Sequence, residues 1–316
     1  MSWEYAALFD AEIRPEADDL MSEMRKNDTR ILVGRMGYRT RTTVAGPRLE
    51  AEVFPAYGRT QTADARKAKS KITPEAQARA NHARSIRNMI LLAETNFTAK
   101  DIAMTLTYEG PEPDYARCQK DIRNFLQRIR RAREKKNLPE LKYIYVIEGG
   151  DGKVRIHSHI LMSGGIDRDE IERIWRKSAN GQGYANADRL QPDSENGLEA
   201  IVIYYAKQLW ARGYKPKSSQ EDEVDGIARY MARRPGLRRK WCRSHNLKQP
   251  KVRTSDSKCS NARVSRIAYD FRYSAKDIME KLYPGYKFVK CSVYHSDVVD
   301  GVYIRCVMRK WGMRYD

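Results

Sequence analysis

The chain has 316 residues, enough for two or three domains with a substantial hydrophobic core. Lys and Arg total 60 against 41 Asp and Glu, which gives a net charge of +19 and an isoelectric point near 9.7. This charge predicts an anionic partner, and nucleic acid fits best, because Lys and Arg neutralise phosphates whatever the base sequence. No run of 18 or more apolar residues occurs, so a transmembrane helix is excluded and an anionic membrane surface is the weaker alternative.

The cysteines and the first residues predict a cytoplasmic protein. The five cysteines include no C-x-x-C pair, and their odd number argues against a zinc finger or a disulfide framework. A reducing compartment suits such thiols. The opening segment MSWEYAALFDAEIRPEADD is acidic and lacks the basic-then-apolar order of a signal peptide.

The N-terminal third predicts a small accessory region, residues 1–98. Residues 38–54 read as two strands around a turn that contains Gly46 and Pro47. A basic stretch then resembles a linker. Thr73, Pro74 and Glu75 provide a capping hydroxyl, a proline at the first helical position and an acid in the first turn, so a helix is expected from 74 to about 95.

A denser pattern follows, and it predicts a domain over residues 99–213. Its elements in chain order are strand 102–108, helix 114–136, strand 142–148, strand 154–162, helix 167–178, a possible short strand in 180–197 and helix 197–213. This order matches the ferredoxin-like split βαβ plan with one extra helix. The predicted fold class is therefore α+β with an antiparallel central sheet, flanked by small accessory β/α segments.

Residues 214–316 differ in composition and predict a basic linker with a C-terminal accessory region. Residues 228–253 are strongly basic with scattered aromatic side chains. Near the end, 286–295 and 301–310 predict a hairpin, with Cys291 and Cys306 in its core.

Two of the five histidines stand in the strand 154–162, within KYIYVIEGGDGKVRIHSHILMSGG. Alternate side chains of a strand point to opposite faces, so His157 and His159 share one face. A tight turn at Asp151-Gly152 would place Glu148 opposite Arg155 and diagonal to His157, on the same face. An even loop preserves this arrangement, and an odd loop would turn Glu148 away.

Two imidazoles and one carboxylate on a sheet predict a metal site. With an open coordination position, the set suits a catalytic zinc or a non-haem iron, and the spacing alone does not choose between metals. The competing interpretation is a pair of polar histidines on an exposed sheet face.

The helix 197–213 adds a tyrosine and a lysine to this site. Tyr204 and Lys207 are three residues apart, hence on one helical face, while Tyr205 belongs to the neighbouring apolar stripe. A tyrosine nucleophile cuts a phosphodiester without losing its bond energy, because the strand stays attached as a phosphotyrosine. A metal would polarise the phosphate oxygens, and Lys207 would hold a phosphate or assist the phenol.

Taken together, these residues resemble the HUH endonuclease superfamily, in particular rolling-circle replication initiators of filamentous phages, plasmids and integrative elements. The first motif is similar to MTLTY (104–108), the metal motif to IEGGDGKVRIHSHILM and the nucleophile motif to YYAK. Weaker similarity extends over roughly residues 38–250.

The resemblance implies that Glu148, His157 and His159 bind Mg²⁺ or Mn²⁺. Tyr204 would nick one DNA strand, join its 5′ phosphate and free a 3′ hydroxyl for a polymerase, with Lys207 as its helper. Ser158 departs from the family, which usually has a hydrophobic residue there. The cluster GGDGKV lacks the spacing of a P-loop, so unwinding is expected from a host helicase.

Other readings remain open at this level. The same chemistry serves a relaxase or transposase of a mobile element, and a DNA-binding protein without catalysis or a metal-dependent hydrolase of small molecules are further classes. Single-stranded or origin DNA is the expected partner, and the oligomeric state is not readable. The candidate DNA contacts are Arg128, Arg131, Arg155, Arg238, Arg239 and Trp241.

Overall fold

The computed structural model describes residues 37–56, 74–149, 154–211, 241–270, 273–295 and 301–312, with the side chains of 74–80, 82, 207–211 and 295 left outside that description. The chain divides into two compact units. Unit 1 combines Met1–Asn88 with Pro250–Met313, and unit 2 contains Met89–Gln249 and Arg314–Asp316. The domain boundaries expected at residues 98 and 213 stay predictions.

Unit 1 is built on an antiparallel sheet in the order β8-β1-β2-β10-β9. Its strands are β1 (Gly37–Ala45), β2 (Arg48–Ala56), β8 (Lys251–Ser255), β9 (Tyr286–His295) and β10 (Val302–Lys310). The predicted hairpins 38–54 and 286–310 are both confirmed, and β10 pairs with β2 to join them. Two helices, α9 (Asn261–Tyr269) and α10 (Ser274–Leu282), pack their apolar sides on one face, and Cys306 is buried in that core.

The opposite face of this sheet carries buried charges. Glu50 and Glu52 on β2 are fully buried, and Arg87 of the helix α4 (Pro74–Asn96) forms ion pairs with both carboxylates. Arg48 and Arg305 also pair with Glu50. Burial favours the neutral form of Glu50, but the surrounding guanidinium groups outweigh it and hold the pKa of this carboxyl well below its ordinary value.

Unit 2 contains the predicted split βαβ fold. Its elements are β3 (Ile102–Tyr108), α5 (Tyr115–Lys135), β4 (Tyr143–Glu148), β5 (His157–Met162), α6 (Arg168–Ser178), β6 (Gly183–Arg189), α7 (Glu199–Ala211) and β7 (Cys242–Arg243). The sheet is antiparallel in the order β6-β3-β5-β4-β7, so the expected α+β class and the possible strand in 180–197 are confirmed. The short strand β7 comes from a segment for which no strand was expected.

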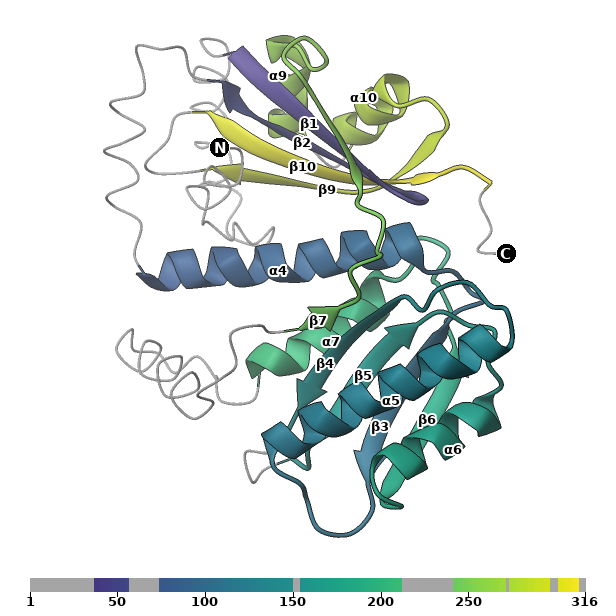
Figure 1. Ribbon diagram of the computed structural model, residues 1–316. Helices are drawn as coiled ribbons and strands as arrows, with labels where there is room; N and C mark the ends of the chain where they lie inside the picture. Colours follow the sequence, from purple (N-terminus) through teal and green to yellow (C-terminus); the bar gives the residue numbers. More distant parts are fainter. Residues whose placement is uncertain are drawn as a thin grey trace. The chain divides into compact units, whose positions relative to one another are not determined.

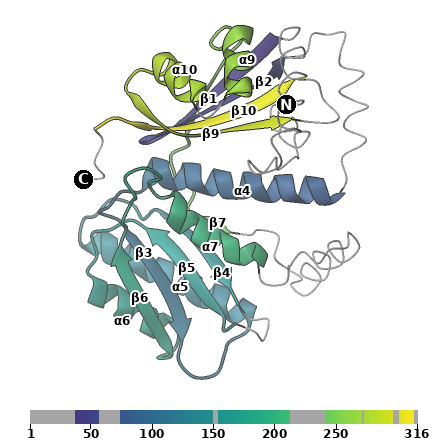
Figure 2. The same ribbon diagram turned by 180° about the vertical axis from the view of Figure 1, so that it is seen from behind.

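Helices α5 and α6 cover one face of this sheet, and α7 lies on the other (Figures 1 and 2). Asp114 caps α5 by accepting a hydrogen bond from the backbone of Arg117, and the apolar stripe of α5 is buried against the sheet. The buried Trp175 of α6 packs edge-on against Phe125 of α5 and donates its indole N–H to the Thr107 carbonyl. We call the sheet face opposite α5 and α6 the open face.

The outer sides of α5 and α6 are cationic. Their exposed basic residues are Lys120, Arg123, Arg130, Arg131, Lys135, Arg168, Arg173, Arg176 and Lys177. The aromatic rings of these two helices are turned inward or half-buried, so the surface offers charge but no exposed ring.

Among the described residues, no helix is long and apolar enough to cross a membrane.

Candidate metal centre

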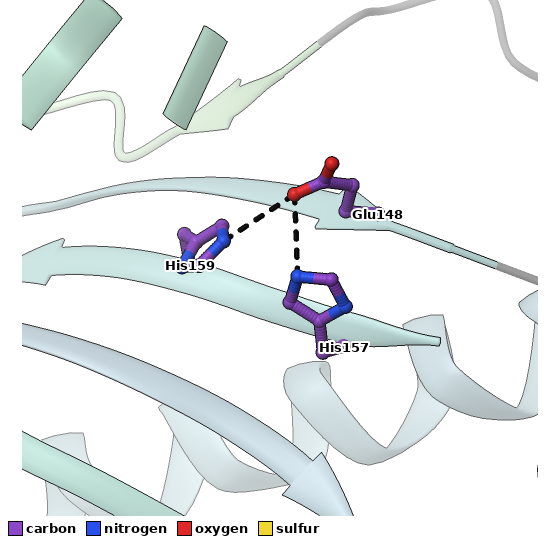
Figure 3. Close-up of side chains that lie close together, drawn as sticks. All are labelled: Glu148, His157 and His159. Carbon is purple, nitrogen blue, oxygen red and sulfur yellow. Dashed lines mark ion pairs between the residues drawn. The ribbon is translucent and has the colours of Figure 1, made fainter. Parts of the chain in front are cut away.

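The two histidines and the glutamate meet on the open face of unit 2. In the β4–β5 pair, Glu148 lies directly opposite His157, and Val146 lies opposite His159. One carboxylate oxygen of Glu148, Oε2, is 3.2 Å from Nε2 of His157 and 3.3 Å from Nε2 of His159 (Figure 3). Each of the three residues thus offers a ligand atom, and these atoms all lie within 4.8 Å of one another.

The register of this pair differs from the expected one by two residues. The sequence predicts Glu148 opposite Arg155, whereas the structure places it opposite His157. The ladder begins later because the backbone N–H of Ile156 donates to the Glu112 carboxylate. Gly149 then takes a positive φ of 83° to leave the strand. The shift is even, so the predicted facing of Glu148 is preserved; residues 150–153, with the expected turn, lie outside the described ranges.

Backbone and hydroxyl groups orient both imidazoles. Nδ1 of His157 lies 2.8 Å from the Arg155 carbonyl, which can only accept, so Nδ1 is the donor of this hydrogen bond and Nε2 is the nitrogen that faces Glu148. Nδ1 of His159 is 3.1 Å from the hydroxyl of Thr105 on β3. Thr105 stands in the MTLTY motif, but nothing in the sequence alone assigned it this contact.

The buried polar atoms of this group fit a cation. Glu148 is 2% exposed, yet among the described residues neither of its carboxylate oxygens has a hydrogen-bond partner, and Nε2 of His159 has none either. A buried carboxylate without hydrogen bonds is costly, and a cation between the three ligand atoms would remove that cost. Burial works to raise the pKa of Glu148, but His157 and His159 outweigh it and hold that pKa below its usual value. The group therefore has the geometry and the charge to hold a metal ion.

Helix α7 brings two tyrosines to the same imidazole. Tyr205 is 4% exposed and stacks on His159, with ring centroids 4.4 Å apart and planes 12° apart. Tyr204 is 55% exposed, and its ring approaches His159 edge-on at 5.5 Å. The burial expected for Tyr205 is confirmed, but its stacking on His159 was not foreseen. Lys207 lies in α7, and its side chain is outside the described set.

Ser158 packs on the far side of the sheet from the metal ligands. It is 1% exposed, and its hydroxyl lies 3.7 Å from the thiol of Cys118 on α5. The pleat thus places a small polar residue at a core position, where a buried thiol contacts it. This departure from the family pattern leaves the ligand face unchanged.

The candidate DNA contacts differ in whether their side chains are exposed or bonded within the protein. Arg131 is exposed on α5 and available to a ligand. Arg128 instead donates to the Ser178 hydroxyl at 2.9 Å, which ties α5 to α6. Arg155 donates to the carbonyls of Tyr108 and Gly110 and so supports a loop.

The remaining candidates lie near the start of β7. Trp241 is half-buried, with the Arg243 guanidinium 6.0 Å from its ring centre. Arg238 and Arg239 lie outside the described residues.

Comparison with protein families matches part of the chain. Residues 101–234 match the family model of replication-associated proteins of the ORF2 and gene II protein type. The matched segment starts one residue before β3 and contains Glu148, His157, His159 and Tyr204. No curated protein and no solved structure matches the chain.

Proposed function

We propose that this chain, whose residues 101–234 match the replication-associated protein family, starts rolling-circle replication by nicking one DNA strand on the open face of unit 2. One observation carries the proposal. The buried Glu148, whose carboxylate oxygens have no hydrogen-bond partner among the described residues, lies next to two histidines, and the exposed Tyr204 lies beside His159. A net charge of +19 suits a nucleic-acid substrate and argues against a hydrolase of small molecules.

Glu148, His157 and His159 would hold the metal ion, which we take to be Mg²⁺ or Mn²⁺. When bound there, a divalent cation polarises the phosphate oxygens and stabilises negative charge as it develops. The chain prepares this site in advance, because the Arg155 carbonyl and the Thr105 hydroxyl fix the two rings.

Tyr204 is the nucleophile in this proposal. Its phenolic oxygen forms a bond to phosphorus while the bond from phosphorus to the 3′ oxygen breaks. The phenolic proton passes to water, and the 3′ oxygen takes a proton from water and leaves as a hydroxyl that a polymerase extends. The 5′ end stays on Tyr204 as a phosphotyrosine, so attack by a 3′ hydroxyl rejoins the strand.

Exposure separates Tyr204 from its neighbour. A nucleophile has to reach a phosphate that comes from solvent, and Tyr204 is 55% exposed whereas Tyr205 is 4% exposed. Burial also raises the pKa of Tyr205, which makes its phenolate costly to form. Lys207 follows Tyr204 by one helical turn, from where an ammonium group would bind the same phosphate or stabilise the phenolate.

Attraction between basic side chains and phosphates would provide most of the affinity for DNA. The exposed Arg and Lys side chains of α5 and α6, including Arg131, suit contacts to phosphates of single-stranded or origin DNA. Strand separation and synthesis then fall to a host helicase and polymerase, since the sequence has no P-loop motif.

The covalent intermediate provides the test. The protein is incubated with Mn²⁺ and a pool of single-stranded oligonucleotides of randomised sequence, and the adduct is digested for peptide mass spectrometry. The expected product is a DNA-linked peptide modified at Tyr204, absent from Tyr204→Phe and present in the matched control Tyr205→Phe.

An adduct on Tyr205 would refute the assignment of the nucleophile. If wild type forms no adduct but binds the pool as well as Tyr204→Phe does, the protein is a DNA-binding protein without nicking activity. Sequencing the DNA attached to the wild-type protein would identify the cut site for the later experiments.

A further inference from the structure

Tyr184 on β6 is a large side chain in an unusual place. The strand GYANADR alternates buried and exposed residues, and Tyr184 is 58% exposed while Ala185 and Ala187 are buried under α6. β6 is the edge strand of the unit 2 sheet. An edge position does not require an aromatic ring, and none of the catalytic roles proposed above uses this residue.

The strand register places Tyr184 in line with the metal ligands. Thr107 on β3 is the cross-strand partner of Tyr184. Thr105 pairs with His159, so Thr107, two residues along, stands across from His157 on the same face. Glu148, His157, Thr107 and Tyr184 therefore form one row across four strands. Two strand spacings separate the backbones of His157 and Tyr184, a distance of roughly 10 Å.

The backbone of Tyr184 is held firmly. A Cβ on the preceding Gly183 would lie 2.8 Å from the Trp175 ring, so only glycine lets β6 approach α6 this closely. The Thr107 hydroxyl donates to the Tyr184 carbonyl at 3.2 Å. These two contacts fix where the ring leaves the sheet. Figure 2 shows α7 on the β4 and β5 side of the open face and β6 at the other edge.

We infer that Tyr184 is a stacking platform for a base of the strand that is cut, a nucleotide or two from the phosphate at the metal site. This inference rests on the proposed function and extends it to substrate positioning. An extended DNA strand covers the roughly 10 Å between the two positions within about two nucleotides. A planar ring on a rigid strand accepts any base, because every base has a π-face.

The chemistry around Tyr184 favours a base over a phosphate. Its same-face neighbours Thr107 and Asn186 are neutral, and the next residue along that face of β6 is Asp188. The Arg168 guanidinium reaches this part of β6, but it pairs with Asp188 at 3.3 Å and donates to the Asn186 amide oxygen at 3.2 Å. Its charge is therefore already matched, and a neutral base gains a ring to stack on. The other exposed cations of α5 and α6 described above lie across the sheet. The stacked base would thus set where the strand lies with little contribution from charge.

Binding measurements that do not depend on nicking test this role. In a Tyr204→Phe background, the affinity for a fluorescein-labelled oligo(dT) strand is measured by anisotropy over a range of salt concentrations. Tyr184→Ala is expected to weaken binding about tenfold, and Tyr184→Phe, which keeps the ring, to remain within about twofold. The slope of affinity against salt should not change, because no phosphate contact is lost.

Two controls separate stacking from structure. Tyr184→Val keeps a strand-forming residue without a π-face and should bind as weakly as Tyr184→Ala. Tyr273→Ala removes a ring that is 78% exposed in unit 1 and should bind as well as the parent. A second readout needs no variant at position 184: an oligo(dT) strand with 5-iodouracil should photo-crosslink to the peptide that contains Tyr184.

The outcomes are distinct. Equal affinity of Tyr184→Ala and its parent, or crosslinks that avoid the Tyr184 peptide, would overturn the inference, even if a covalent adduct on Tyr204 had confirmed the nicking. A Tyr184→Phe variant as weak as Tyr184→Ala would also overturn it, because stacking does not need the hydroxyl. If these binding results were obtained but wild type formed no covalent adduct, the stacking role of Tyr184 in DNA binding would stand and the proposed nicking activity would be refuted.

Discussion

The ring of Tyr205 lies flat against the imidazole of His159, 4.4 Å away between centroids. At the edge of the same imidazole, Nδ1 lies 3.1 Å from the Thr105 hydroxyl. Ring stacking and a hydrogen bond therefore both hold His159 in place. Tyr205 thus positions His159, one of the three candidate metal ligands.

Tyr205 should contribute through its ring and not through its hydroxyl. We expect Tyr205→Phe to bind Mn²⁺ within about twofold of wild type, and Tyr205→Ala to lose about tenfold in affinity because His159 loses its support. Isothermal titration calorimetry measures both, with Tyr204→Phe as a control that keeps wild-type affinity. A Tyr205→Phe protein as weak as Tyr205→Ala would show that the hydroxyl matters instead.

Binding of a divalent cation should stabilise the folded protein through the three ligands. At a metal concentration one hundred times the dissociation constant, the gain in the free energy of unfolding is about 2.7 kcal/mol. Thermal unfolding with Mn²⁺ and with EDTA measures this gain. Glu148→Ala should show no metal-dependent shift, and a shift equal to that of wild type would place the binding elsewhere.

Gly149 should be needed for the geometry of Glu148. A Cβ at position 149 would lie 2.3 Å from the Arg155 carbonyl oxygen, a contact between backbone atoms that cannot yield without moving β4 or β5. We expect Gly149→Ala to lower both metal affinity and stability. Gly181→Ala is the matched control, since Gly181 has φ +82° but no atom within 4 Å of the added Cβ. Equal effects of the two substitutions would mean that only φ matters.

Acid should weaken unit 1 through Glu50. Its folded pKa lies below the ordinary value of 4.5, so its ion pairs stabilise the fold above pH 4.5, and this contribution is lost as the pH falls through the lowered pKa. Glu50→Gln should cost about 3 kcal/mol at pH 7, and the difference from wild type should shrink as the pH falls below 4.5. Urea unfolding at several pH values measures it. The exposed Glu140→Gln serves as control, and a difference at Glu50 that is independent of pH would contradict the prediction.

The strands and helices of unit 2 could be predicted because their patterns are local. Alternation along 154–162 placed both histidines on one face, and the stripe on α5 identified its buried side. The β4–β5 register could not be predicted, because it depends on Glu112, an acceptor more than forty residues from Ile156. The stacking of Tyr205 and the strands β7 and β8 likewise depend on partners far along the chain.

The two surfaces of unit 2 differ in kind: the helices α5 and α6 present cations, while the open face presents the rings of Tyr184 and Tyr204. Dissolved salt competes with the first kind of contact and hardly with the second. Under the proposed function, ionic strength should therefore govern how long the protein stays on a DNA molecule without altering which bond is cut. Under the same proposal, a cell that changes its ion content would adjust the frequency of initiation and leave the site of initiation fixed.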